Sequence, residues 1–133
     1  MAEQTILIAE DDPDIRDGVR ILLSGEGYHI IEAENGTRAL EVFRPEVDLV
    51  ILDIMMPEMR GDELCSTIKN DIETSHIPVL LLTALGEEQN ILDGLDIGAD
   101  EYIVKPFSIR ILKASIANLL ANRALLRSKY ANL

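Results

Sequence analysis

Five side chains that could do chemistry stand directly after short apolar runs of this sequence. Glu10 and Asp11 follow the first of five such runs. Asp53 follows the third, Thr83 the fourth and Lys105 the fifth. Three carboxylates held together repel one another, and Mg2+, which prefers oxygen ligands, relieves that repulsion. Because a carboxylate can attack phosphorus while a cation and a lysine offset charge, we predict an aspartyl-phosphate site at Asp53 beside Mg2+.

Taken one at a time, these residues have plainer interpretations. Glu10 and Asp11 could be solvated loop acids, Thr83 could simply end a strand, and Lys105 could be a surface charge. Their occurrence together at the ends of separate runs favours the site. Asp12 is interpreted differently, as the N-cap of the helix that Pro13 begins, because aspartate is a preferred N-cap residue.

The apolar runs have the length and composition of buried strands, and segments with helical spacing alternate with them. We predict strands at residues 5–9, 29–33, 49–52, 79–82 and 101–104, and helices at 13–25, 37–43, 61–71, 87–94 and from 108 onward. Strands that are apolar throughout and alternate with helices indicate a parallel sheet covered on both faces, a doubly wound three-layer α/β sandwich. Ligands bind such sheets at the carboxyl ends of the strands, where the five side chains stand.

The composition bounds the function further. The chain has 133 residues and a formal net charge of −12, so this domain alone is not expected to bind nucleic acid. No apolar stretch approaches the roughly 20 residues of a membrane span, and the single Cys65 fits a cytoplasmic, reducing setting. Every acidic residue lies at or before Glu101, so the last helix is basic.

Four segments, in this order, resemble the receiver domains of two-component response regulators. They are ILIAEDD (6–12), LVILDIMMP (49–57), PVLLLTA (78–84) and GADEYIVKPF (98–107). The resemblance covers about residues 4–121. It implies a flavodoxin-like fold with five parallel strands in the order 2-1-3-4-5.

The resemblance also implies a role for each acidic residue at the site. Asp53 would be the phosphoacceptor. Glu10 and Asp11 would hold Mg2+, with Asp11 the more direct ligand, and the backbone carbonyl of Met55 would complete the protein's share of the metal shell.

Three further roles follow from the same resemblance. Lys105 would contact the phosphoryl group, and a cis peptide bond is expected before Pro106. Thr83 and Tyr102 would be paired switch residues, although Tyr102 could equally serve core packing alone. One departure concerns Arg60, which stands before Gly61 where the family commonly has aspartate.

Partners are likewise implied by the resemblance. A histidine kinase or a phosphotransfer domain would donate the phosphoryl group, and the surface of helix 4, strand 5 and helix 5 would then control an output such as transcription. Residues 63–84 and 115–130 resemble receivers of hybrid two-component proteins of Bacteroides-type bacteria. In those proteins sensor, kinase, receiver and an AraC-type DNA-binding region share one polypeptide.

The last helix is longer than one domain needs. We predict a receiver domain at 1–121 and, at 122–133, an extension of the last helix or a linker toward an output domain. Six apolar residues of the last helix follow an alternating four-three spacing, which Arg123 interrupts. They are Leu112, Ile116, Leu119, Leu126, Tyr130 and Leu133. Such spacing favours homodimerisation or a connection to a downstream domain. A frayed tail remains the alternative.

Two other functional classes compete with this interpretation. A Mg2+-dependent aspartyl phosphohydrolase would need a second acid two residues after its nucleophile, and that position is Met55. A phosphorylation-independent interaction module would not need the complete set of acceptor residues. The sequence therefore favours a phosphoacceptor domain that is not an enzyme beyond its own phosphorylation and dephosphorylation.

Overall fold

The computed structural model describes residues 3–84 and 98–131. The strands are β1 (Thr5–Ala9), β2 (His29–Ala33), β3 (Leu49–Asp53), β4 (Val79–Ala84) and β5 (Glu101–Lys105). The helices are α1 (Pro13–Gly25), α2 (Gly36–Val42), α3 (Gly61–Asn70) and α5 (Ile109–Ala131). The helix predicted at residues 87–94 lies outside the described residues.

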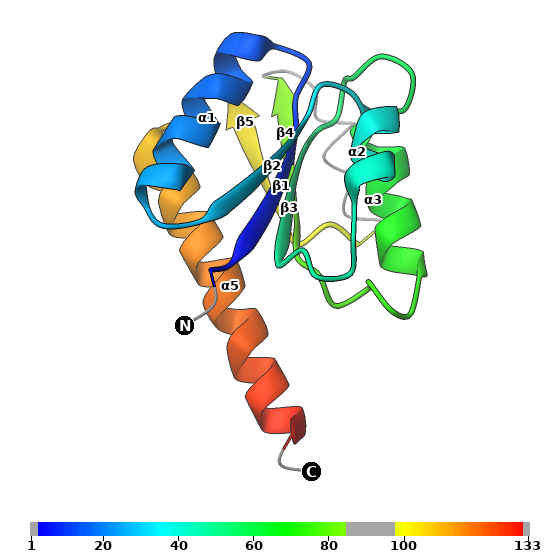
Figure 1. The fold of residues 1–133 in the computed structure, drawn as a ribbon, viewed down its shortest axis with the longest axis vertical. Coiled ribbons are helices and arrows are strands. Elements are labelled where there is room, and N and C mark those ends of the chain that lie inside the picture. The colour runs from blue at the N-terminus through cyan, green and yellow to red at the C-terminus, as the bar shows by residue number, and fades with distance from the viewer. Residues whose placement is uncertain (1–2, 85–97, 132–133) are drawn as a thin grey trace.

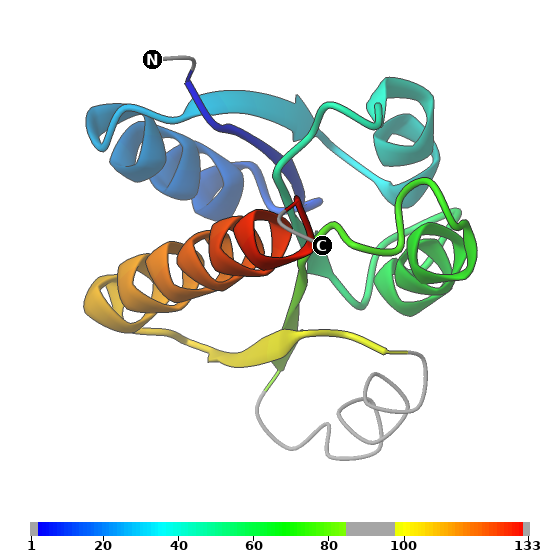
Figure 2. The ribbon, with the colours of Figure 1, turned by 90° about the horizontal axis from the view of Figure 1, so that it is seen from below.

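All five strands pair in parallel in one sheet with the order β2-β1-β3-β4-β5, which confirms the predicted topology. Helices α1 and α5 cover one face of the sheet, and α2 and α3 cover the other (Figure 1). The view from below shows the three layers edge-on (Figure 2). The predicted doubly wound sandwich is therefore confirmed for the described part of the chain.

The core is aliphatic and lies in two layers, one on each side of the sheet. Ile6 and Ile8 pack in the cluster beneath α1 and α5, whereas Leu7 and Ala9 pack in the cluster beneath α2 and α3. This alternation follows from the two-residue repeat of a strand. Every residue of β3 is buried, which places Asp53 at the end of an entirely buried strand.

The helix starts follow local capping chemistry. The Asp12 carboxylate accepts hydrogen bonds from the backbone N–H groups of Asp14 and Ile15, at 2.9 and 3.4 Å, so the predicted N-cap is confirmed. An Asn-Gly pair such as Asn35-Gly36 is typical of a turn, but here it starts a helix. Asn35 caps α2 by accepting from the Arg38 N–H at 2.7 Å, and Gly36 is the first residue of that helix.

Strands β3 and β5 each end one residue later than predicted, and β4 ends two residues later. Asp53 pairs with Leu82, and Thr83 pairs with Val104. Backbone pairing continues past the last apolar residue because ladder hydrogen bonds do not depend on side-chain polarity. The candidate site residues Asp53, Thr83 and Lys105 are therefore held within strands rather than in loops.

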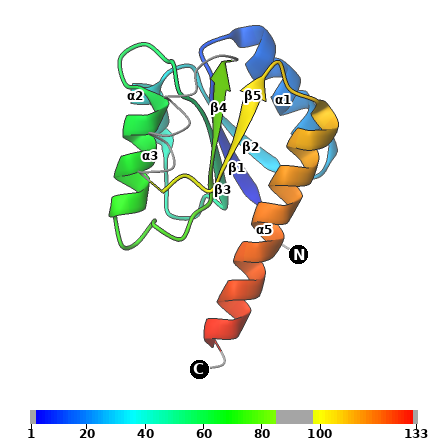
Figure 3. The ribbon, with the colours of Figure 1, turned by 180° about the vertical axis from the view of Figure 1, so that it is seen from behind.

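Helix α5 continues without a break past residue 121 and projects beyond the sheet (Figure 3). The guanidinium of Arg123 donates to the carboxylate of Asp48 at 2.8 Å and to its backbone carbonyl at 3.1 Å. The other carboxylate oxygen of Asp48 accepts from the Thr5 N–H at 2.7 Å. Arg123 thus interrupts the apolar spacing because it anchors the helix to the starts of β1 and β3. None of the described helices is long and apolar enough to cross a membrane.

Candidate functional site

Three carboxylates meet where β1 and β3 end. Glu10 and Asp11 follow β1, and Asp53 ends the neighbouring strand β3. One oxygen of each carboxylate lies within 4.8 Å of the others. Glu10 and Asp53 are buried, with exposed fractions of 0% and 6%, while Asp11 is exposed to solvent. The structure therefore brings together the three acids that the sequence placed at strand ends, with one side of the group open.

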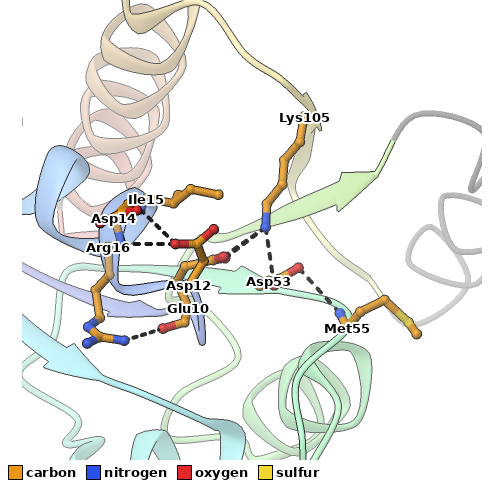
Figure 4. Close-up of polar contacts among 8 residues, drawn as sticks. All are labelled: Glu10, Asp12, Asp14, Ile15, Arg16, Asp53, Met55 and Lys105. Carbon is orange, nitrogen blue, oxygen red and sulfur yellow. Dashed lines mark hydrogen bonds and ion pairs between the residues drawn. The ribbon is translucent and has the colours of Figure 1, made fainter.

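Lys105 bridges two of these carboxylates from the end of β5 (Figure 4). Its ammonium nitrogen lies 2.9 and 3.0 Å from the two oxygens of Glu10 and 3.2 Å from one oxygen of Asp53. The peptide bond between Lys105 and Pro106 is cis, as the resemblance led us to expect. The buried negative charge is thus partly offset by one fixed positive charge.

Burial changes the protonation of these groups. It raises the pKa of Glu10 to about 7, against the opposing effect of Lys105. Burial also raises the pKa of Asp53, again opposed by Lys105. Burial alone would lower the pKa of Lys105, but its hydrogen bonds and ion pairs with Glu10 and Asp53 outweigh this and raise it. A carboxyl whose pKa is raised by folding costs stability once ionised, so Glu10 destabilises the fold increasingly as pH rises from 4.5 to 7.

This donor set fits Mg2+. The ion prefers oxygen ligands, takes one or two carboxylates together with water, and leaves room for phosphate oxygens. A divalent cation would also offset the charge repulsion that Lys105 only partly relieves. Glu10, Asp11 and Asp53 are the side chains that would hold it.

Thr83 carries a buried hydroxyl near the end of β4, one residue after Leu82, which pairs with Asp53. Its side chain is 1% exposed, and its oxygen has no hydrogen-bond partner among the described residues. Buried polar groups without a partner are uncommon because each costs about 1–3 kcal/mol. The strand pairings place Thr83 and Tyr102 on the same face of the sheet, where half-buried Tyr102 packs against the cluster beneath α2 and α3. Thr83 therefore supplies an unused donor and acceptor at the carboxyl end of β4.

The loop after β3 is held close to Asp53. The Met55 N–H donates to a carboxylate oxygen of Asp53 at 3.4 Å. Arg60, the departure noted in the sequence, forms a two-point ion pair with Asp62 at 3.0 and 3.2 Å. Its guanidinium also lies 3.2 Å from the Met55 sulfur. The arginine charge is thus directed to α3 and the loop. The Met55 carbonyl as a metal ligand stays a prediction.

Gly61 lets α3 approach the end of β3. A Cβ atom at this residue would lie 2.1 Å from the backbone oxygen of Asp53. The Gly61 N–H donates to the carbonyl of Ile54 at 2.9 Å, so neither backbone can easily move apart. The need for glycine here comes from tertiary packing, and the sequence gives no periodic signal for it.

We expect Gly61→Ala to lower the free energy of unfolding by about 1–3 kcal/mol, as other overpacked sites do. Gly18→Ala is the matched control, because a Cβ at Gly18 in α1 meets nothing within 4 Å. Alanine there should stabilise the helix by about 0.5–1 kcal/mol. Urea denaturation followed by circular dichroism measures both changes. Equal effects of the two substitutions would contradict the proposed close approach.

Sequence reasoning also missed Arg16. Its guanidinium donates to the backbone carbonyl of Glu10 at 2.7 Å, on the side of the acidic loop that faces away from Lys105 (Figure 4). The six-residue separation carries no recognisable signal, because the contact depends on how α1 folds back over the end of β1.

The fold and site define a doubly wound α/β domain with a lysine-bridged acidic centre at the carboxyl edge of its sheet. Comparison with known proteins then gives the family. Residues 6–117 match the response regulator receiver domain. The chain belongs to the response regulator receiver family, the phosphoacceptor domains of two-component systems.

Individual relatives agree with this assignment. The chain is 47% identical over 131 residues to Histidine kinase P4 of Formosa agariphila, a match covering 98% of this chain and 10% of that protein. It is 44% identical over 121 residues to the phosphate regulon transcriptional regulatory protein PhoB of Pseudomonas aeruginosa, covering 90% of this chain and 53% of that protein. A putative response regulator from Chloroflexus aurantiacus superposes with a TM-score of 0.84 at 31% identity, covering 90% and 99% of the two chains. The chain thus spans about half of the regulator and a tenth of the kinase.

Proposed function

We propose that this domain takes a phosphoryl group from a phosphohistidine of a histidine kinase or phosphotransfer domain onto Asp53, with Mg2+ bound by the acidic group. One observation carries the proposal. Oxygens of Glu10, Asp11 and Asp53 lie within 4.8 Å of one another, and the Lys105 nitrogen lies 3.2 Å from Asp53. Such an arrangement is suited to holding a cation and a phosphoryl group side by side.

The chemistry is a displacement at phosphorus. An oxygen of Asp53 forms the new bond to phosphorus while the bond from phosphorus to the histidine nitrogen breaks, and the histidine keeps the electron pair. Bound Mg2+ supplies positive charge that stabilises the oxygens of the transferring group. Lys105 moves part of its ion pairing from the carboxylates to a phosphoryl oxygen. The unpartnered hydroxyl of Thr83 then hydrogen-bonds another oxygen.

The proposed switch acts through these same residues. Movement of the Thr83 hydroxyl toward the phosphoryl group would vacate space on the face that it shares with Tyr102. A phosphoryl group can shift this balance only by its different affinity for the two arrangements. The changed surface would include β5 and α5 and would control an output such as transcription, as the names of several relatives suggest.

That surface and the projecting end of α5 also suggest partners. Leu125 and Leu126 are about half exposed, at 55% and 51%, on the part of α5 that extends beyond the domain. We propose that this end, with the surface of β5 and the rest of α5, supports homodimerisation or a connection to a downstream domain. If the chain is part of a hybrid kinase, we propose that the end of α5 connects the receiver to a downstream domain.

Intact-mass analysis after incubation with acetyl phosphate and Mg2+ tests the proposed function. We expect a gain of one phosphoryl group that chelation by EDTA prevents. Because an acyl phosphate is a reactive mixed anhydride, neutral hydroxylamine should remove the group, whereas a phosphoserine or phosphothreonine would persist. No gain in mass, or a gain that resists hydroxylamine, would contradict a carboxylate acceptor.

A further inference from the structure

We propose that Arg16 is a positioning residue for the metal site, which it serves by fixing the peptide group that joins Glu10 to Asp11. This inference rests on the proposed function, because it concerns the Mg2+ affinity of the same acidic group. Arg16 lies in the first turns of α1, and its side chain is 18% exposed. Its guanidinium donates to the Glu10 carbonyl at 2.7 Å (Figure 4).

Glu10 is held at every polar group it carries. Its N–H donates to the carbonyl of Ala33 in β2 at 3.1 Å, and its carboxylate accepts from Lys105. Its carbonyl would otherwise be free to rotate with the following peptide plane, and Arg16 removes that freedom. Among the contacts of the described residues, the Arg16 hydrogen bond is the one that reaches the peptide group between Glu10 and Asp11.

The consequence falls on Asp11. Its side chain is exposed, so packing does not hold it, and its place beside Asp53 depends on the direction in which the backbone leaves Glu10. Rotation of the Glu10–Asp11 peptide would swing the Asp11 carboxylate away from Asp53. Groups that orient metal ligands without touching the metal commonly change metal affinity about 10- to 100-fold when they are removed.

The guanidinium is itself held by a second contact. Its Nε lies 3.7 Å from a carboxylate oxygen of Glu32, and Arg20 reaches that same oxygen at 3.4 Å. Arg20 is also paired with Asp17 at 3.6 Å and has no described contact with the acidic loop. The two arginines therefore share one partner on β2, while only Arg16 reaches the Glu10 carbonyl.

Charge and position predict effects of opposite sign. If Arg16 mattered only as a nearby positive charge, removing it would strengthen Mg2+ binding, because the repulsion between the guanidinium and the Mg2+ ion would be lost. If Arg16 positions the peptide, removing it weakens Mg2+ binding even though a repelling charge has gone. The sign of the change therefore separates the two explanations.

The test is a Mg2+ titration of the full chain without any phosphodonor. Two-dimensional NMR monitors the titration and gives the Mg2+ affinity. Arg16→Met should weaken Mg2+ binding about tenfold. Arg20→Met, which removes the same charge one turn along α1, should bind Mg2+ as tightly as the wild type or slightly more tightly. Arg16→Lys keeps the charge but not the planar fork of donors, and it should fall between the wild type and Arg16→Met.

A second measurement excludes a general loss of structure. Phosphorylation of Arg16→Met by acetyl phosphate should need about tenfold more Mg2+ for half its maximal rate, yet reach a nearly normal rate at saturating Mg2+. The inference is overturned if folded Arg16→Met and Arg16→Lys bind Mg2+ as tightly as Arg20→Met. Failure of the wild type itself to bind Mg2+ would instead overturn the proposed function, and this inference with it.

Discussion

Replacing Asp53 with asparagine is expected to abolish phosphoryl uptake from acetyl phosphate. Asparagine keeps the size and shape of the side chain, but its amide is a poor nucleophile and cannot form an acyl phosphate. The change is measured as the phosphorylated fraction by intact mass at saturating Mg2+. Because the other acids at the site are Mg2+ ligands in this proposal, neither should take over as acceptor.

The same substitution should make the Mg2+-free protein more stable. Burial raises the pKa of Asp53, so its ionised form costs free energy in the folded state, and a neutral amide removes that cost. The free energy of unfolding in EDTA at neutral pH should therefore rise. The added stability that Mg2+ gives the wild type should largely disappear.

Asp12→Asn is the matched control for both measurements. It removes a carboxylate from the same acidic loop, but Asp12 is occupied as the N-cap of α1, and asparagine caps helices equally well. Asp12→Asn should keep phosphoryl uptake near the wild-type level. Two results would contradict Asp53 as the phosphoacceptor. One is a mass gain in Asp53→Asn equal to that of the wild type, and the other is a loss of uptake in Asp12→Asn as large as in Asp53→Asn.

The second large effect is expected at Lys105. Replacing it with methionine leaves the buried carboxylates of Glu10 and Asp53 without their shared cation. Removing one partner of a buried ion pair typically costs 3–5 kcal/mol, and the 20% exposure of Lys105 places this case near the lower limit. We expect Lys105→Met to lower the free energy of unfolding by about 3 kcal/mol at pH 8 in EDTA.

This loss should depend on pH in a definite direction. The pKa of Lys105 is raised by folding, so the lysine stays charged throughout the neutral range. The pKa of Glu10 is about 7 in the folded wild type, so at pH 5.5 it is mostly protonated and Lys105 faces fewer negative charges. The destabilisation by Lys105→Met should therefore be largest above pH 7 and smaller at pH 5.5.

Lys113→Met is the control for this substitution. Lys113 pairs with Glu26, but both side chains are about two-fifths exposed, and such surface pairs contribute little. Urea denaturation of the three proteins at pH 8 and pH 5.5 gives the comparison. Equal losses for Lys105→Met and Lys113→Met, or a Lys105→Met loss that grows toward pH 5.5, would contradict the electrostatic account of the site.

The sequence by itself determined the parallel α/β sandwich and the set of acids at the site, whereas the strand order was expected only from the family resemblance. Short strands that are apolar throughout can only be buried on both faces, and the helices between them require parallel pairing. Residues at the ends of such strands must gather at one edge of the sheet. Glu10, Asp11, Asp53 and Lys105 could therefore be placed together by sequence periodicity, and the structure brings them to contact distance.

Local chemistry was less fully predictable. The cap at Asp12 followed from residue type, but the Asn35-Gly36 pair, which starts α2, is also typical of a turn. An Asn-Gly pair suits both structures. The choice depends on the close approach of Gly36 to the Met59 carbonyl, where a Cβ would lie only 2.0 Å away.

Only the tertiary structure decided the properties that make the edge a site. The raised pKa of Glu10 and the unpartnered hydroxyl of Thr83 come from burial, which depends on all the elements packed around them. The contacts of Arg16 with the Glu10 carbonyl and of Arg123 with Asp48 join residues whose separations of six and 75 follow no repeat. Periodicity reports which face of an element is buried, whereas such contacts depend on where whole elements end relative to one another in space.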